Sequence, residues 1–158
     1  GGAPTCAVVR ALAASALVAR SGVCTTAPCV VSDDMEQWDG VNGWAPLHML
    51  LVDALEHVGE RRAARGVALR WLRTIHAAWA LHNGTMYEKY DVTRVGVRGV
   101  GGEYAVQVGF GWTNAVALLL AARYLRDDAA DVAAARRFVL DVDGVLPPVP
   151  LDISERCA

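Results

Sequence analysis

Residues 46–84 read PLHMLLVDALEHVGERRAARGVALRWLRTIHAAWALHNG, and this stretch predicts a pair of helices. Pro46 suits the first turn of a helix, where its missing N–H has no helical partner to lose. Behind it, apolar residues recur at helical spacing, which predicts a single buried stripe on the first helix. The stripe consists of Leu47, Leu50, Leu51, Ala54, Leu55 and Val58.

A second helix is predicted from about residue 63 to residue 81. Gly59 indicates a break between the two helices near residues 60–62, and Asn83-Gly84 is typical of a helix stop. Because the connection is short, the two helices are expected to be antiparallel neighbours. The face of the second helix that should be buried carries Ala68, Leu72, Ile75 and Trp79, and we expect both Trp71 and Trp79 to belong to the core.

Further helices are predicted on both sides of this pair. The apolar window at residues 6–19 predicts a buried or amphipathic helix that ends near Gly22. Residues 113–125 predict a third helix, and residues 129–140 predict a fourth, which Asp127 and Asp128 can cap. Three prolines within residues 147–150 end regular structure, so residues 141–158 are expected to form an irregular tail. The pattern as a whole predicts an all-α fold.

The composition is that of one apolar-rich domain. The chain has 158 residues, of which 54% are apolar, and this is ample for a single core. Its 15 basic and 17 acidic residues give a net charge of −2, which argues against a nucleic-acid binder. The window at residues 6–19 is interrupted by Arg10 and is shorter than the ~20 apolar residues of a membrane span. We therefore expect no nucleic acid and no membrane segment in this chain.

The cysteines and histidines do not form a metal-binding pattern. The four cysteines lack CxxC spacing and have no histidine at zinc-finger spacing, so no metal is expected. The four histidines are interpreted as core or surface residues. The cysteines are Cys6, Cys24, Cys29 and Cys157, and the sequence does not fix their pairing.

Two loops carry residue types suited to a carbohydrate. Residues 86–114 read MYEKYDVTRVGVRGVGGEYAVQVGFGWTN and hold Glu88 and Glu103 among glycines and aromatic rings. Residues 37–46 read QWDGVNGWAP, with two tryptophans and three polar side chains that can form hydrogen bonds. Carboxylates accept hydrogen bonds from hydroxyls, aromatic rings stack on sugar faces, and glycine lets backbone approach a ligand closely.

Together and in this order, the blocks QWDGVNGWAPL, MYEKYDV, GGEY and GFGWTN resemble the trehalases, which are inverting glycoside hydrolases. The resemblance covers roughly residues 37–120, and Gly1-Gly2-Ala3-Pro4-Thr5 is similar to a Gly-Gly-x-Pro segment that precedes these blocks in the family. It implies the C-terminal part of an (α/α)6 barrel, a toroid of six helical hairpins. The implied substrate is trehalose, a small molecule split into two glucoses by carboxyl groups and water, without metal or cofactor.

The resemblance also assigns roles to residues. It makes Glu88 the general base that activates water, and it makes Glu103 a ligand of sugar hydroxyls, although Glu103 as the base stays an alternative. A plain salt bridge of Glu88 with Lys89 or an arginine is a further alternative. Gln37 and Trp38 are expected to line the glucose pocket. Trp44 and Trp112 are as well explained by packing as by contact with sugar.

Several features depart from the family pattern. Residues 7–36 resemble nothing in it and are either an atypical insertion or translated non-coding sequence, whereas residues 37–125 form the family-like core. The general acid is expected to be an Asp in an upstream block that this chain lacks, so the chain alone should be inactive. Val41, His48 and Ala115 stand where the family usually has Pro, Gln and Gly.

Two other functions stay open at this stage. The chain could belong to a sugar-binding relic without turnover, or to a related helical-toroid α-glucosidase. An extracellular or periplasmic location is common among trehalases and is inherited only from the resemblance, and the oligomeric state is not predicted.

Overall fold

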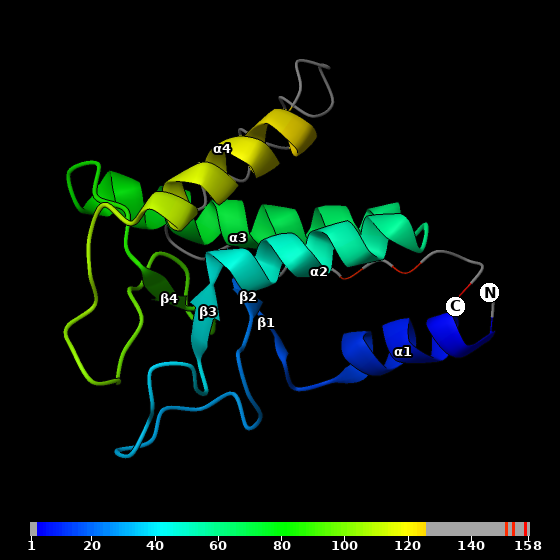
Figure 1. Ribbon diagram of the computed structural model, residues 1–158, viewed down its shortest axis with the longest axis horizontal. Coiled ribbons are helices and arrows are strands. Elements are labelled where there is room, and N and C mark those ends of the chain that lie inside the picture. The colour runs from blue at the N-terminus through cyan, green and yellow to red at the C-terminus, as the bar shows by residue number, and fades with distance from the viewer. Residues whose placement is uncertain (1–2, 126–150, 152, 154–156, 158) are drawn as a thin grey trace.

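The computed structural model describes residues 3–125 together with residues 151, 153 and 157. These residues form four helices and four short strands, and the helices dominate, as the sequence predicts. Figure 1 shows α2 and α3 side by side, with α4 beside them and the strands β3 and β4 gathered at one end of the helices. The elements are α1 (Ala3–Ala14), β1 (Val18–Ala19), β2 (Gly22–Val23), β3 (Asn42–Trp44), α2 (Ala45–His57), α3 (Arg61–Leu81), β4 (Lys89–Asp91) and α4 (Gly111–Tyr124).

The helical pair α2–α3 is confirmed, with boundaries close to those predicted. Residues 58–60 connect the two helices, and Gly59 takes a φ of 86° in the turn between them. At the far end of α3, the N–H of Gly84 donates to the carbonyl of Trp79 at 2.9 Å, and Asn83 and Gly84 both have positive φ. This is the backbone pattern of a glycine-terminated helix.

The buried face of α2 differs from the predicted stripe. The residues that α2 buries are Ala45, His48, Val52 and Leu55, so Leu55 alone belongs to both sets. Leu47 is 40% exposed and Leu50 is 66% exposed. The helix is apolar on two sides, and α3 packs against the side that carries His48, whose ring stacks on Trp71 of α3.

The two tryptophans assigned to the core of α3 behave differently. Trp71 is fully buried, as predicted, and its ring meets that of Tyr90 edge to face. Trp79 is 45% exposed, so its assignment to the core is wrong. Trp79 lies in the last turn of α3, where a Cβ on Gly84 would lie 3.3 Å from its Nε1, so it covers the turn that ends the helix.

The first helix ends earlier than predicted. Residues 6–19 were expected to stay helical toward Gly22, but α1 stops at Ala14 and a hairpin of β1 and β2 follows. Ser15 explains the stop, because its hydroxyl donates to the carbonyl of Leu12 and accepts the N–H of Leu17. Such local side-chain bonds compete with helical ones. The hairpin pairs Val18 with Val23.

The third predicted helix is confirmed as α4, which runs beside both α2 and α3. Arg123 forms ion pairs with Asp53 at 2.6 Å and with Glu56 at 3.2 Å, and these tie the end of α4 to α2. The fourth predicted helix at residues 129–140 lies outside the described residues, as does most of the tail at 141–158. Among the residues that are described, no helix combines the length and apolar character needed to cross a bilayer.

All four cysteines are paired in two disulfides. Cys6 on α1 is bonded to Cys157, which joins segments 151 residues apart in the sequence. Cys24 is bonded to Cys29 and closes a short loop directly after β2. Each of the four cysteines therefore has a structural role in a disulfide, a pairing that the sequence alone does not fix.

Candidate active site

The antiparallel pair β3–β4 brings the two sequence blocks of the candidate site together. Asn42 pairs with Asp91, Gly43 with Tyr90, and Trp44 with Lys89. The first block leads into β3 from Gln37, and Glu88 immediately precedes β4. Gly43 lies so close to its neighbours that a Cβ there would be 2.3 Å from Val92 and 3.2 Å from Trp71. The two blocks therefore meet over the buried aromatic rings of the core.

The Glu88 carboxylate is buried among hydrogen-bond donors. Only 1% of the residue is exposed. Its Oε1 accepts the Tyr104 hydroxyl at 2.8 Å and the Gln37 Nε2 at 3.3 Å, and its Oε2 accepts the backbone N–H of Gln107 at 3.2 Å. The backbone N–H of Glu88 donates in turn to the Gln107 carbonyl at 2.9 Å. The side chain is thus fixed in one orientation as an acceptor.

Lys89 does not neutralise Glu88 through a direct ion pair, but joins the loops around it. Its Nζ donates to the carbonyls of Gly101 at 2.8 Å, Val100 at 3.1 Å and Gln37 at 3.3 Å. Since an ammonium has three N–H donors, all of them are used. The ammonium also lies 5.6 Å from the centroid of the Trp44 ring. Burial lowers the pKa of Lys89, and the nearby Glu88 carboxylate opposes this. The alternative of a Glu88–Lys89 salt bridge is not seen among the described residues.

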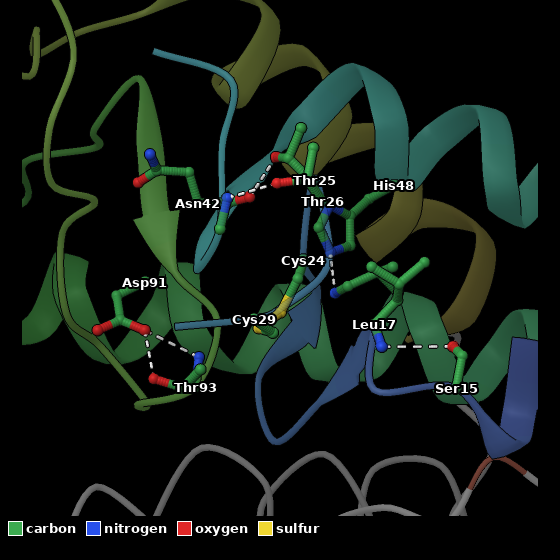
Figure 2. The surroundings of a disulfide bond; sticks show 12 residues. Ser15, Leu17, Cys24, Thr25, Thr26, Cys29, Asn42, His48, Asp91 and Thr93 are labelled. Atoms are coloured by element: carbon green, nitrogen blue, oxygen red, sulfur yellow. Dashed lines mark hydrogen bonds between the residues drawn. A yellow bond between two sulfur atoms is a disulfide. The ribbon is translucent and has the colours of Figure 1, made fainter. Parts of the chain in front are cut away.

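Asn42 connects the same loops from the strand side. Its Nδ2 donates to the Val100 carbonyl at 2.9 Å, and its Oδ1 accepts the Val100 N–H at 3.0 Å. Figure 2 shows Thr25 next to Asn42 and the Cys24–Cys29 disulfide just below them. The N–H of Thr25 donates to the Asn42 carbonyl at 3.0 Å, and its hydroxyl donates to the same atom. The disulfide loop thus braces the strand that carries Asn42.

The tryptophans of the first block form a cluster with one open face. Trp38 stacks on Trp44 with ring centroids 3.8 Å apart, and Trp112 meets both rings edge to face. Trp44 is 1% exposed, so packing explains it, and Trp112 is partly buried in the same cluster. Trp38 is 42% exposed, which leaves one side of its indole available for stacking.

Glu103 lies in the exposed part of the glycine-rich loop and forms no hydrogen bond or ion pair with the described residues. The loop reverses at Gly101 and Gly102, which both have positive φ. A Cβ on Gly102 would lie 1.7 Å from the Gln37 Oε1, so only glycine permits this close approach. The reversal places Tyr104 back over Glu88.

Three of the four predicted site residues lie in one neighbourhood. These are Gln37 and Glu88, which are hydrogen-bonded, and Trp38, which follows Gln37 directly. The fourth, Glu103, forms no hydrogen bond with these three residues, but it precedes Tyr104, whose hydroxyl donates to Glu88. Sequence reasoning missed Tyr104, Gln107 and the side chain of Asn42. The block GGEY contained a signal for the tyrosine, whereas the Gln107 contact uses only its backbone and has no sequence signature.

The three departures from the family pattern fit the structure without disturbing these contacts. Val41 is buried, and its carbonyl accepts the N–H of Val92 at 2.9 Å. His48 is fully buried below β3, and Ala115 is exposed on α4. The other histidines are exposed or partly buried and contact no predicted site residue. The described residues contain no cluster of three or more His, Cys, Asp or Glu side chains that could hold a metal ion.

Comparisons with known proteins agree with the resemblance carried by these blocks. The family model described as Trehalase matches residues 5–124, a range that extends across the segment 7–36. A probable trehalase of Oryza sativa subsp. japonica is 44% identical over 114 residues, which cover 70% of this chain and 19% of that protein. A trehalase of Homo sapiens is 48% identical over 92 residues, which cover 56% of this chain and 16% of that protein.

The fold comparison agrees with the sequence comparisons. The solved structure of the neutral trehalase of Saccharomyces cerevisiae matches with a TM-score of 0.56 and 25% sequence identity. The match covers 85% of this chain and 21% of the yeast chain. The chain therefore spans about a fifth or less of the length of these three proteins.

Proposed function

Because this chain belongs to the trehalase family, we propose that it is part of an enzyme that hydrolyses α,α-trehalose to two glucose molecules. In this proposal the chain supplies the general base and one side of the sugar pocket. The general acid comes from another part of the complete protein. The observation that carries the proposal is the Glu88 carboxylate, which is buried and bonded only to donors.

Glu88 is suited to accept a proton from water. Hydrogen bonds from Tyr104, Gln37 and the Gln107 backbone use both carboxyl oxygens of Glu88 as acceptors and hold the side chain in place. In an inverting reaction the base removes a proton from water as the water oxygen attacks the anomeric carbon. The bond to the leaving oxygen breaks on the opposite face, and the general acid protonates that oxygen. One glucose is therefore released as the β anomer and the other as the α anomer.

The surrounding side chains match the other needs of a glucose site. Trp38 offers an open indole face beside Gln37, and Glu103 is an exposed carboxylate on the adjoining loop. An exposed carboxylate with no protein partner in the described residues can accept hydrogen bonds from sugar hydroxyls. We therefore assign Trp38 and Glu103 to substrate binding, and we assign Gln37 to the contact between the pocket and the base.

We also propose that the chain forms part of an (α/α)6 barrel. The antiparallel pair α2–α3 has the form of one helical hairpin. Apolar side chains also remain exposed on neighbouring helices: Leu47 at 40% and Leu50 at 66% on α2, and Leu118 at 73% and Leu119 at 53% on α4. Faces of this kind mark interaction surfaces, and further helices of the barrel are the proposed occupants.

The test measures glucose release from trehalose by the complete protein and by its Glu88→Gln variant. Glutamine keeps the size of the side chain but cannot accept the proton from water, so kcat should fall by about 10²- to 10⁴-fold. Glu56→Gln is the matched control, because Glu56 is also a glutamate that accepts a tyrosine hydroxyl, but between α2 and α4. Its kcat should change by less than about twofold. The 158-residue chain alone should release no glucose.

Other results would indicate a different catalytic residue or a different function. Full activity of Glu88→Gln would move the base to another residue, with Glu103 as the first candidate. Trehalose binding without glucose release by the unmodified protein would indicate a sugar-binding relic. Release of glucose from maltose but not from trehalose would indicate a different α-glucosidase.

A further inference from the structure

The two oxygens of the Glu88 carboxylate are not equivalent. Oε1 accepts two side-chain donors, the Tyr104 hydroxyl at 2.8 Å and the Gln37 Nε2 at 3.3 Å. Oε2 accepts one donor, the Gln107 backbone N–H at 3.2 Å. A carboxylate has about four lone-pair positions, two on each oxygen. Both lone-pair positions of Oε1 are therefore occupied, and the lone-pair position that receives no donor from the described residues is on Oε2.

From this asymmetry we propose that Tyr104 is a positioning residue for the general base. Together with Gln37 it occupies Oε1 and so directs the open lone pair of Oε2 to the attacking water. This inference rests on the proposed function. It specifies that Oε2 of Glu88 takes the proton and that Tyr104 determines this choice between the two oxygens.

The hydrolytic step balances with this assignment. An O–H bond of water breaks and its proton moves to Oε2 of Glu88, while the water oxygen forms a bond to the anomeric carbon. The electron pair of the glycosidic bond goes to the leaving oxygen, which takes a proton from the general acid. Tyr104 keeps its own proton throughout, because its hydroxyl is the donor to Oε1.

Tyr104 is placed for this role and contributes little to packing. The loop reversal at Gly101 and Gly102 returns the chain so that the Tyr104 hydroxyl reaches the same oxygen of Glu88 as the Gln37 amide. The Tyr104 side chain is otherwise half exposed. Its hydrogen bond to Glu88 raises the pKa of Tyr104, which keeps the hydroxyl protonated as a donor at neutral pH. Removing the hydroxyl should therefore change the carboxylate more than the fold.

Tyr104 also follows Glu103, the proposed ligand of sugar hydroxyls. A sugar that binds Glu103 would settle the same loop segment that carries the donor to Glu88. One loop segment then carries both the substrate-binding carboxylate of Glu103 and the Tyr104 hydroxyl that orients Glu88. The two glutamates are thereby coupled although they are fifteen positions apart in the sequence.

The test uses the complete protein with Tyr104→Phe, which deletes one oxygen atom. A hydrogen bond to a charged group is worth enough that kcat should fall about 10- to 100-fold, with KM changed less than about threefold. A loss in kcat without a matching change in KM is the result expected of a residue that orients the base rather than binds the substrate. Tyr124→Phe is the matched control, since it deletes the hydroxyl that donates to Glu56, and its kcat and KM should equal those of the unmodified protein.

A double-mutant cycle separates positioning from general damage. In the Glu88→Gln background, Tyr104→Phe should lower the residual kcat by less than about twofold, because there is no carboxylate left to orient. Glucose release by the unmodified protein establishes the proposed function independently of Tyr104. If that release is present but Tyr104→Phe leaves kcat unchanged, or if its effect persists in the Glu88→Gln background, the inference about Tyr104 is overturned and the proposed function stands. No release by the unmodified protein would overturn both.

Discussion

His48 is a buried neutral side chain whose titration should control the stability of this chain in mild acid. Its ring is fully buried and stacks on Trp71 with centroids 4.0 Å apart. The N–H of Val23 donates to Nε2 at 2.9 Å, so Nδ1 must carry the proton, and Nδ1 lies 2.8 Å from the Trp44 carbonyl. Protonation of Nε2 would place a charge in the core and remove this acceptor. Burial accordingly lowers the pKa of His48 from 6.5 to about 4, against the opposing effect of its bond to Trp44.

The size and sign of the effect follow from this shift. Between pH 6.5 and about pH 4 the unfolded chain binds a proton at His48 that the folded chain does not. The free energy of unfolding therefore has its full value above pH 6.5 and falls as the pH falls. With 1.36 kcal/mol for each pKa unit, the loss due to His48 is about 2 kcal/mol at pH 5 and about 3 kcal/mol at pH 4.

The assay is urea unfolding of the chain followed by tryptophan fluorescence, with Trp71 beside the titrating ring. The matched variant is His48→Gln, because an amide can accept from Val23 and donate to Trp44 but does not titrate in this range. Loss of the stacking between His48 and Trp71 changes the unfolding free energy of the variant by an amount that does not depend on pH. The difference in unfolding free energy should change by about 2 kcal/mol between pH 7 and pH 5 in favour of the glutamine variant. Parallel pH dependences of the two proteins would refute the reasoning.

Two further changes test the loops of the site. Lys89→Met removes the ammonium that donates to three backbone carbonyls. In the same urea assay it should lower the free energy of unfolding by about 3 kcal/mol. A decrease below about 1 kcal/mol would contradict the role of Lys89 in joining the loops. Gly102→Ala places a Cβ 1.7 Å from the Gln37 Oε1 and should lower kcat/KM of the complete protein at least about tenfold. Gly109→Ala is its control, since Gly109 also has positive φ but has no atom within 4 Å of a Cβ, so equal losses in the two variants would assign the effect to backbone strain alone.

The helices could be predicted from the sequence because their signals are local. Pro46, the break at Gly59 and the stop at Asn83-Gly84 set the boundaries of α2 and α3 within a few residues. The choice of buried face was not local, because α2 is apolar on two sides and only its neighbours decide which side is covered. Leu50 was therefore expected inside and is exposed, whereas His48 is buried.

The short strands and the donors around Glu88 could not be predicted in the same way. Strands of three residues, such as β3 and β4, are too short for an alternating pattern, and they pair across more than forty positions of sequence. The contact between Tyr104 and Glu88 depends on how Gly101 and Gly102 reverse the loop. Glu88 itself was identified because the block around it resembles a family, not because its surroundings could be derived.

The identity of the general base is tested most directly by rescue with azide. Glu88→Ala in the complete protein removes the base and leaves space beside the anomeric carbon, while the general acid stays intact. Azide needs no deprotonation and should attack from the side of the missing carboxylate, so trehalose should yield β-glucosyl azide, detected by NMR, at a rate well above hydrolysis by the same variant. Formation of that azide by Glu103→Ala but not by Glu88→Ala would contradict the assignment of Glu88 and transfer the role to Glu103.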